Sequence, residues 1–143
     1  MTVALPRFQQ TNDAACGYAS AAMVARKFRP TVDLDRLARA LKTDESGTRQ
    51  TAIERALRGL GITVSTHYDL DFAHLTAHLD RDHPIIVYRT DIDHWCVLCG
   101  YDRDPSRVYI ADPLPGRPAS YPWSEITRKL QRGFGMVCSD LRR

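Results

Sequence analysis

The chain has 143 residues, 43% hydrophobic and 26% charged, and its 20 lysines and arginines exceed its 17 acidic residues by three. This length suffices for one domain with its own core, and the composition is that of a globular protein, which excludes disordered, coiled-coil and collagen-like chains. The basic residues are spread along the chain, so charge gives no support for nucleic-acid binding. We therefore expect a single domain over residues 1–143.

The sequence contains no apolar run close to the roughly 20 residues that a membrane helix needs. One of the longest apolar stretches, PIIVY, covers only 84–88. The N-terminus lacks a basic region followed by an apolar one, so no signal peptide is expected. These features predict a cytoplasmic protein without membrane insertion, and they leave open export by a dedicated secretion system.

The first half of the chain has the periodicity of helices. Residues 16–28 (CGYASAAMVARKF) are rich in alanine, follow the capping pair Asn12-Asp13, and carry small side chains that suit a closely packed helix. Apolar residues recur at helical spacing in 33–41 and 49–60, with Gly47-Thr48 as loop and cap before the second of these. Three helices are predicted, and the first is expected to be central.

The second half changes to the two-residue period of strands. Strands are predicted at 62–68, 84–89, 94–101, 107–111 and 134–138, with helices at 72–79 and 123–132. The segment DRDPS between the 94–101 and 107–111 strands has the composition of a hairpin turn. Helices followed by strands point to an α+β fold with an antiparallel sheet, and not to a doubly wound one.

Four cysteines occur, at positions 16, 96, 99 and 138. In a reducing compartment they are expected to be free thiols. Cys96 and Cys99 have the spacing of a metal knuckle, but strand alternation points them to opposite faces, and zinc needs four ligands. His74 and His78 have the spacing with which two side chains of one helix can bind a metal, but the sequence offers no third ligand near them. We therefore predict no metal and no cofactor.

Cys16 differs from the other cysteines because it begins a helix. The unpaired N–H groups and the positive end of the helix dipole stabilise a thiolate there and lower the pKa of the thiol. A nucleophile also needs a base, and His94 opens a strand directly after the polar segment TDID. Asp112 ends the next strand and is followed by Pro113. The hairpin is expected to bring Asp112 beside His94, where it orients the imidazole.

Attack by Cys16 on a carbonyl creates an oxyanion, which needs hydrogen-bond donors. The backbone N–H of Cys16 is one, and the side-chain amide of Gln10, upstream on the approach loop, is a candidate for the other. Taken alone, Cys16 is more often a buried helical thiol and His94 a strand-edge histidine. The joint pattern of all four residues indicates a catalytic pair with its supporting groups.

Three aromatic residues lie near these segments. Trp95 is predicted to be a core residue, because alternation turns it away from the face that His94 uses. Tyr121 and Trp123 belong to or border the proline-rich stretch 113–122. They either flank the cleft or pin the last helix, and the sequence leaves both readings open.

These residues also carry a resemblance to a known family. The segment from Gln10 through Cys16 and the small residues after it resembles the glutamine, spacer, cysteine-glycine and helix of the bacteriocin-processing cysteine peptidases, which cleave double-glycine leaders. The 47–48 loop, HWCVLCGYD (94–102) and VYIADP (108–113) with Gly116 match further family segments in the same order. The resemblance covers nearly the whole chain, from about Leu5 to the last strand.

The resemblance implies a papain-like fold and a set of roles. Cys16 is implied as nucleophile, His94 as general base and acid, Asp112 as orienting carboxylate, and Gln10 as part of the oxyanion hole. Family members best known for leader cleavage are fused to an ATP-binding transporter, whereas this sequence has no membrane span and no phosphate-binding loop. A standalone domain that acts on a peptide or protein substrate is therefore expected.

Three functions follow from this pattern. The first is a cysteine peptidase, for which the resemblance implies cleavage after Gly-Gly. The second is an amidase, deamidase or acyl transferase, which shares the same chemistry up to the acyl-enzyme. The third is a non-catalytic module that binds leader peptides. Loss of a triad residue would mark that module, and none is lost here.

Overall fold

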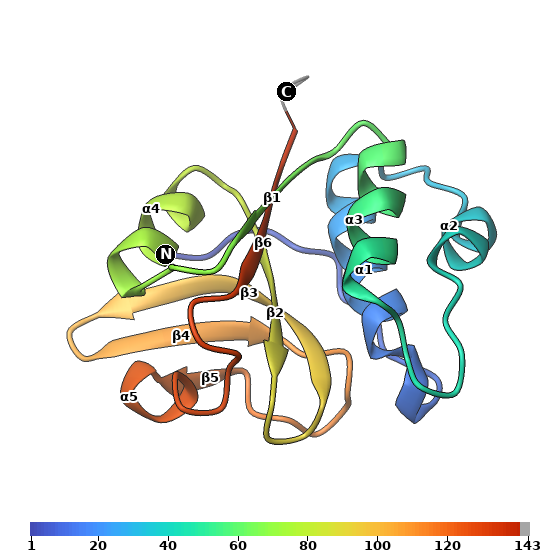
Figure 1. The fold of residues 1–143 in the computed structure, drawn as a ribbon. Coiled ribbons are helices and arrows are strands. Elements are labelled where there is room, and N and C mark those ends of the chain that lie inside the picture. Colours follow the sequence, from blue (N-terminus) through green and yellow to red (C-terminus); the bar gives the residue numbers. More distant parts are fainter. Residues whose placement is uncertain (141–143) are drawn as a thin grey trace.

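Three helices form one side of the molecule in the computed structural model, which describes residues 1–140 (Figure 1). They are α1 (Cys16–Phe28), α2 (Leu34–Leu41) and α3 (Gln50–Gly59), close to the predicted spans. α1 is buried along most of its length and contacts α2, α3 and strand β3. Its small side chains allow this close approach on several sides, so α1 is the central helix, as the sequence predicts.

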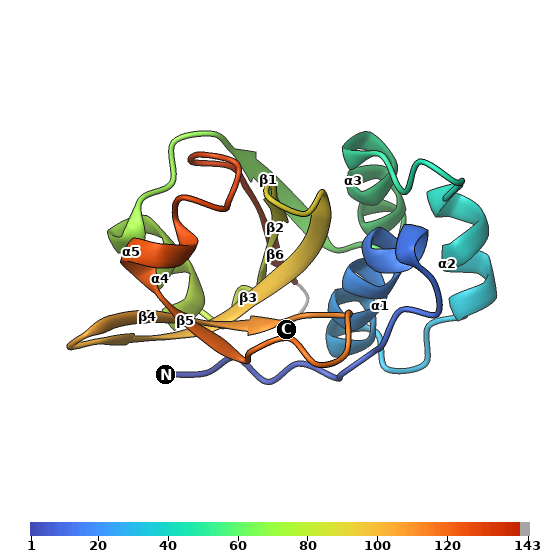
Figure 2. The same ribbon diagram turned by 90° about the horizontal axis from the view of Figure 1, so that it is seen from below.

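The described strands form one antiparallel sheet in the order β1-β6-β2-β3-β4-β5. The sheet curls around α4 (Phe72–Asp80) and α5 (Trp123–Ile126), while α1–α3 stand against its other side (Figure 2). This arrangement confirms the α+β fold. The strands are β1 (Thr63–His67), β2 (Ile85–Arg89), β3 (His94–Arg103), β4 (Ser106–Ala111), β5 (Ser120–Pro122) and β6 (Gly135–Ser139).

The segment after Trp123 differs from the prediction of a helix over 123–132. α5 ends at Ile126, and the chain then pairs with the end of β2: the N–H of Thr90 donates to the carbonyl of Lys129 at 2.8 Å and that of Gln131 to the carbonyl of Tyr88 at 2.8 Å. Turn bonds continue as far as Leu130, whose N–H donates to the carbonyl of Ile126 at 3.1 Å, but from Lys129 onward the chain also bonds to the end of β2, and this tertiary pairing overrides the local helical pattern. The short strand β5 is likewise absent from the sequence prediction.

Two predicted caps act elsewhere. Thr48 does not cap α3, whose N-cap is Arg49 without a side-chain bond; the Thr48 hydroxyl pairs with that of Thr43 at 2.6 Å instead. Asn12 caps the 3₁₀ turn Asp13–Ala15 that leads into α1, accepting the N–H of Ala14 at 3.0 Å. This turn delivers the chain to the start of α1.

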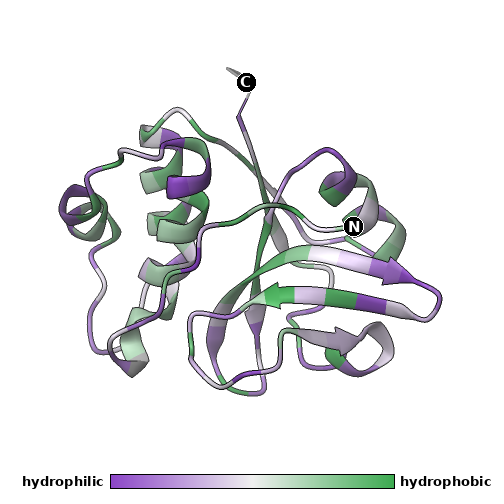
Figure 3. Cartoon of the chain, turned by 180° about the vertical axis from the view of Figure 1, so that it is seen from behind, coloured by the Kyte–Doolittle hydropathy of each residue, from purple (hydrophilic) through white to green (hydrophobic). Residues whose placement is uncertain are grey.

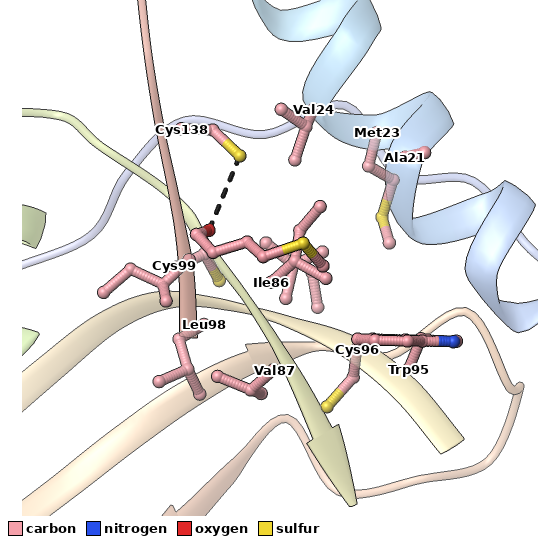
Figure 4. Packing of buried hydrophobic residues seen from close by; sticks show 14 of the residues in the cluster. Ala21, Met23, Val24, Ile86, Val87, Trp95, Cys96, Leu98, Cys99 and Cys138 are labelled. Atoms are coloured by element: carbon pink, nitrogen blue, oxygen red, sulfur yellow. Dashed lines mark hydrogen bonds between the residues drawn. The ribbon is translucent and has the colours of Figure 1, made fainter. Parts of the chain in front are cut away.

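The hydrophobic core is continuous between helices and sheet. Figure 3 shows apolar residues along α1 and the central strands, and polar ones at the turn between β3 and β4. Met23 of α1 points toward Ile86 and the indole of Trp95, all of them buried (Figure 4). The core also holds Cys96 and Cys138, and all four cysteines are free. Within residues 1–140, no helix has the length and apolar character to cross a bilayer.

The N-terminal segment, residues 1–15, runs from the sheet to α1. Thr2 lies opposite Gly100, and the N–H of Val3 donates to the carbonyl of Cys99 at 2.6 Å. A Cβ on Gly100 would lie 2.6 Å from the carbonyl oxygen of Met1, so only glycine permits this close approach. Further along, the N–H of Gln10 donates to the carbonyl of Pro113 at 2.9 Å. The segment is therefore attached to β3 and to the loop that follows β4.

Candidate active site

Cys16 is the first residue of α1, and its side chain faces the start of β3. Its Sγ accepts a hydrogen bond from the backbone N–H of Trp95 at 3.5 Å, and the imidazole of His94 lies near enough to act on the pKa of the thiol. The residue is only 4% exposed. A buried sulfur with an imidazole and a backbone donor at a helix N-terminus has the surroundings that favour a thiolate.

His94 and Asp112 lie on neighbouring strands, as the predicted hairpin requires. The register pairs Val97 with Ala111, which leaves Asp112 just beyond β4 and level with the first residues of β3. The His94 Nε2 lies 2.6 Å from Asp112 Oδ1, and both side chains are at most 5% exposed. The same oxygen accepts the N–H of Leu114 at 2.9 Å, which fixes the carboxylate. With Nε2 on Asp112, the ring presents Nδ1 to Cys16.

Hydrogen bonding and charge favour the ionised forms of Cys16 and His94. Burial opposes a charged imidazole, but the hydrogen bonds and negative charges of Asp112 and Cys16 raise the pKa of His94 to about 9. Burial also opposes a thiolate at Cys16, but the bonds from the His94 ring and the Trp95 N–H, with the imidazolium charge, lower the pKa of that thiol below its ordinary value. The site therefore favours the thiolate–imidazolium pair more than the two side chains would on their own.

The other cysteines lie in surroundings that suppress ionisation. Burial raises the pKa of Cys138 to about 12, and it also raises the pKa values of Cys96 and Cys99. Cys96 and Cys99 have different neighbours: the charges of Asp112 and Arg89 act on Cys96, whereas the Cys99 Sγ lies 3.7 Å from the carbonyl of Tyr109. Of the four cysteines, only Cys16 has surroundings that stabilise the thiolate.

Gln10 lies in the same cleft as Cys16 and His94. Its Nε2 donates to the carbonyl of Asn12 at 2.9 Å, while Oε1 is buried and finds no partner within residues 1–140. An amide nitrogen has two hydrogens, so one N–H remains for a substrate oxygen. The structure thus brings together all four residues singled out in the sequence.

The cleft has a volume of about 620 Å³, and several of its lining residues escaped the sequence analysis. They include the acidic residues Glu45 and Asp93, the cationic Arg117 and the aromatic Tyr88. Asp93 accepts a hydrogen bond from the Tyr88 hydroxyl at 3.2 Å. These residues lie on loops or at a strand end, where polar side chains are common, so nothing in the sequence distinguishes them from ordinary surface residues.

The aromatic residues take more specific places than predicted. Trp95 is buried in the core as expected, but it also lines the cleft, and its indole N–H donates to the carbonyl of Thr48 at 3.1 Å. The sequence analysis did not predict that the backbone N–H of Trp95 donates to the Cys16 sulfur, because a backbone donor has no signature in the sequence. Trp123 packs on Phe72 of α4 at 5.6 Å between ring centroids, and Tyr121 is buried near Arg89, so neither lines the cleft.

The predicted histidine pair separates into two environments. His74 belongs to the cap of α4, where its N–H donates to Asp71 Oδ1 at 2.8 Å and its ring nitrogen faces the Asp71 N–H at 3.4 Å. The His78 ring instead lies 5.5 Å from the His67 ring and 6.5 Å from the His83 ring. Among the described residues, no group of three or more side chains is arranged to hold a metal ion.

Comparison with solved structures shows the same fold in peptidase domains. A double glycine motif protease from an AMS/PCAT transporter, in complex with its leader peptide, is 21% identical, with a TM-score of 0.76 and 96% of this chain and 92% of that chain covered. The peptidase domain of Streptococcus ComA, a bi-functional ABC transporter involved in quorum sensing, is 21% identical, with a TM-score of 0.76 and coverage of 96% and 98%.

A third match is the N-terminal peptidase C39 like domain of a toxin secretion ATP-binding protein from Vibrio parahaemolyticus, 14% identical, with a TM-score of 0.65 and coverage of 92% and 99%. No curated protein sequence matches this chain significantly. The sequence pattern of the Peptidase_C39 like family matches residues 2–137, almost the entire chain. This chain therefore belongs to the Peptidase_C39 like family and has the fold of cysteine peptidase domains.

Proposed function

We propose that this chain hydrolyses a peptide bond through an acyl-enzyme on Cys16. The thiolate attacks the carbonyl carbon and forms a tetrahedral intermediate. As that intermediate collapses, the C–N bond breaks and the His94 imidazolium gives its Nδ1 proton to the departing amine. The neutral ring then takes a proton from a water molecule, whose oxygen attacks the thioester carbon and forms a second tetrahedral intermediate. As this intermediate collapses, the C–S bond breaks, the acid is released and the thiolate–imidazolium pair is restored.

Asp112 and Gln10 support these steps in different ways. Asp112, 2.6 Å from Nε2, orients the ring so that Nδ1 faces the sulfur, and its negative charge favours the imidazolium. The remaining N–H of Gln10 and the backbone N–H of Cys16 are the proposed donors to the oxyanion. The observation that carries the proposal is the buried Cys16–His94–Asp112 series at a helix N-terminus, open to a cleft of about 620 Å³.

The proposed substrate is a peptide with a Gly-Gly pair before the scissile bond. Support comes from the family and from the solved structure of a double glycine motif protease in complex with its leader peptide. A reducing compartment, such as the cytoplasm expected from the sequence, keeps Cys16 reduced, as the reaction requires.

The test compares two synthetic peptides that differ only by Gly-Gly or Ala-Ala at the expected cleavage site. Mass spectrometry should detect cleavage directly after Gly-Gly with the wild-type chain, much slower cleavage of the Ala-Ala peptide, and none with Cys16→Ala. Release of ammonia, or transfer to an added amine without cleavage, would instead support the amidase or transferase reading. Binding of the Gly-Gly peptide without turnover would support a binding module.

A further inference from the structure

A buried arginine lies on the same face of the sheet as His94. Arg89 ends β2 and is only 3% exposed, a place that a guanidinium occupies only when its donors are bonded. In the register of β2 and β3, Arg89 stands directly opposite His94. Directly opposite residues of an antiparallel pair send their side chains to the same face, so Arg89 is a neighbour of the proposed base.

The guanidinium uses all three of its nitrogens to join the turn after β2 to β5. Nε and Nη2 donate to the two carboxylate oxygens of Asp91 at 3.1 and 2.7 Å, a bidentate pair. Nη1 donates to the hydroxyl of Tyr121 at 3.1 Å, and the guanidinium carbon lies 5.3 Å from the centre of that ring. Tyr121 belongs to β5, and β3, which begins at His94, and β4, which ends just before Asp112, lie between β2 and β5.

The partner carboxylate, Asp91, lies in the turn 90–93 that leads directly into His94. This turn sets the place of two groups on Cys16: the imidazole of His94 and the backbone N–H of Trp95. Its first residue is held from outside by the bond of the Thr90 N–H to Lys129. Arg89 holds the next residue from the buried side of the sheet. A shift of about 1 Å in a reacting group can lower a rate by about 10²-fold, so this turn has to be held firmly.

We propose that Arg89 is a positioning residue for the Cys16 site. Its fork on Asp91 and its bond to Tyr121 hold the turn 90–93 so that His94 and the Trp95 N–H stay directed at the sulfur. The inference rests on the proposed function, because it assigns Arg89 to the same site. Arg89 makes no contact with the cleft and acts only through the turn.

The test replaces Arg89 by methionine, which keeps the apolar stem and removes the guanidinium. We expect the kcat of Arg89→Met for a Gly-Gly peptide to fall about 10- to 10²-fold with little change in KM. The pH profile of Cys16 alkylation should also move to higher pH, because a displaced imidazole supports the thiolate less. Arg89→Lys should not restore either value, since an ammonium cannot form the bidentate pair.

Arg103→Met is the matched control. Arg103 also lies over a tyrosine, 5.1 Å from the Tyr101 ring centre, but its side chain is 61% exposed and far along β3 from His94. Its kcat and alkylation profile should equal those of the wild type. If Arg89→Met does not fold, Asp91→Asn takes its place, because it breaks the same pair from the turn.

The alkylation profile needs no peptide and separates two failures. A wild-type Cys16 that reacts only at the pH of an ordinary thiol contradicts the proposed function itself. A wild-type profile at low pH that Arg89→Met or Asp91→Asn leaves unchanged, with only a lower melting temperature, overturns the positioning role of Arg89 and leaves the proposed function intact.

Discussion

At the scale of single residues, the four cysteines show how surroundings decide the chemistry of one side chain. All four are buried, and burial alone raises the pKa of a thiol. At Cys138 burial acts without opposition and raises the pKa to about 12. At Cys16 the imidazole of His94 and the N–H of Trp95 outweigh burial, so the pKa of this thiol is lowered. Reactivity should therefore differ strongly among residues with similar exposure.

We expect iodoacetamide to label Cys16 much faster than Cys96, Cys99 or Cys138 at about pH 6, because only Cys16 has donors that hold a thiolate. Peptide mapping by mass spectrometry after short exposure checks this. His94→Ala, as the control, should slow labelling of Cys16 and leave the other three unchanged. Labelling of Cys138 at the same rate as Cys16 would contradict the nucleophile assignment.

The pH dependence of activity should reflect the raised pKa of His94. Because the leaving amine needs a proton from the imidazolium, kcat/KM should fall as the pH rises through about 9. Asp112 helps to raise the pKa of His94, so Asp112→Asn should move this falling limb to lower pH as well as reduce the rate. Asp102→Asn, at the far end of β3, is the control. If the falling limb of Asp112→Asn stays at the wild-type pH, Asp112 does not help to raise the pKa of His94.

Gln10 should matter only when negative charge builds on the substrate oxygen. Gln10→Ala is expected to lower kcat about 10²- to 10³-fold with little change in KM, while alkylation of Cys16 stays near the wild-type rate. Gln10→Glu should be at least as damaging, since a carboxylate would face the oxyanion. Steady-state kinetics with Gln9→Ala, an exposed neighbour, as control checks this. Full activity of Gln10→Ala would contradict the assignment of Gln10 as a donor to the oxyanion.

At the scale of elements, the start of α1 depends on the close approach of the 47–48 loop. A Cβ on Gly17 would lie 2.5 Å from the Cβ of Thr48 and 3.1 Å from Cδ1 of Trp95. Neither atom is the end of a flexible chain, so the loop or the helix has to shift. The residue after the proposed nucleophile is therefore glycine for reasons of packing.

Gly17→Ala should lower the free energy of unfolding by about 1–3 kcal/mol and reduce activity, because Cys16 moves with the helix. Gly59→Ala is the matched control: it also adds a methyl group to a helical glycine, but its Cβ meets no atom of residues 1–140 within 4 Å, its own helix backbone aside. It should be neutral or stabilising by about 0.4–1 kcal/mol. Urea unfolding of both variants checks the difference, and equal values would contradict the packing argument.

The elements also show what a sequence can and cannot predict. α1 and the β3–β4 hairpin follow from local patterns, so Cys16, His94 and Asp112 could be proposed together from the sequence. The end of α5 depends on bonds between Lys129–Gln131 and β2, which join residues far apart in the chain. The bond of the Trp95 N–H to the Cys16 sulfur likewise joins residues far apart in the chain. The Arg89–Asp91 pair spans only two residues, but it depends on the geometry of the turn, which local composition does not reveal.

At the scale of the whole molecule, the continuous core predicts that helices and sheet unfold together. Trp95 lies where the two meet, bonded to Thr48, whereas Trp123 packs on α4 within the curled sheet. Trp95→Phe leaves only the fluorescence of Trp123, and Trp123→Phe leaves only that of Trp95. In each variant, unfolding by urea should have the same midpoint by tryptophan fluorescence as by far-UV circular dichroism. Two separate midpoints would contradict a single domain over residues 1–143.

The attachments of the N-terminal segment have a consequence for the order in which the site is completed during synthesis. Gln10 leaves the ribosome before most of the chain, yet its segment is fixed by bonds to Cys99 and Pro113, which are made much later. The sheet itself is completed later still, because β1 and β2 are joined through β6, the last of the described strands. The proposed oxyanion donor is thus among the first site residues to be made and among the last to be fixed. A nascent chain should stay inactive until residues 135–139 have been inserted into the sheet.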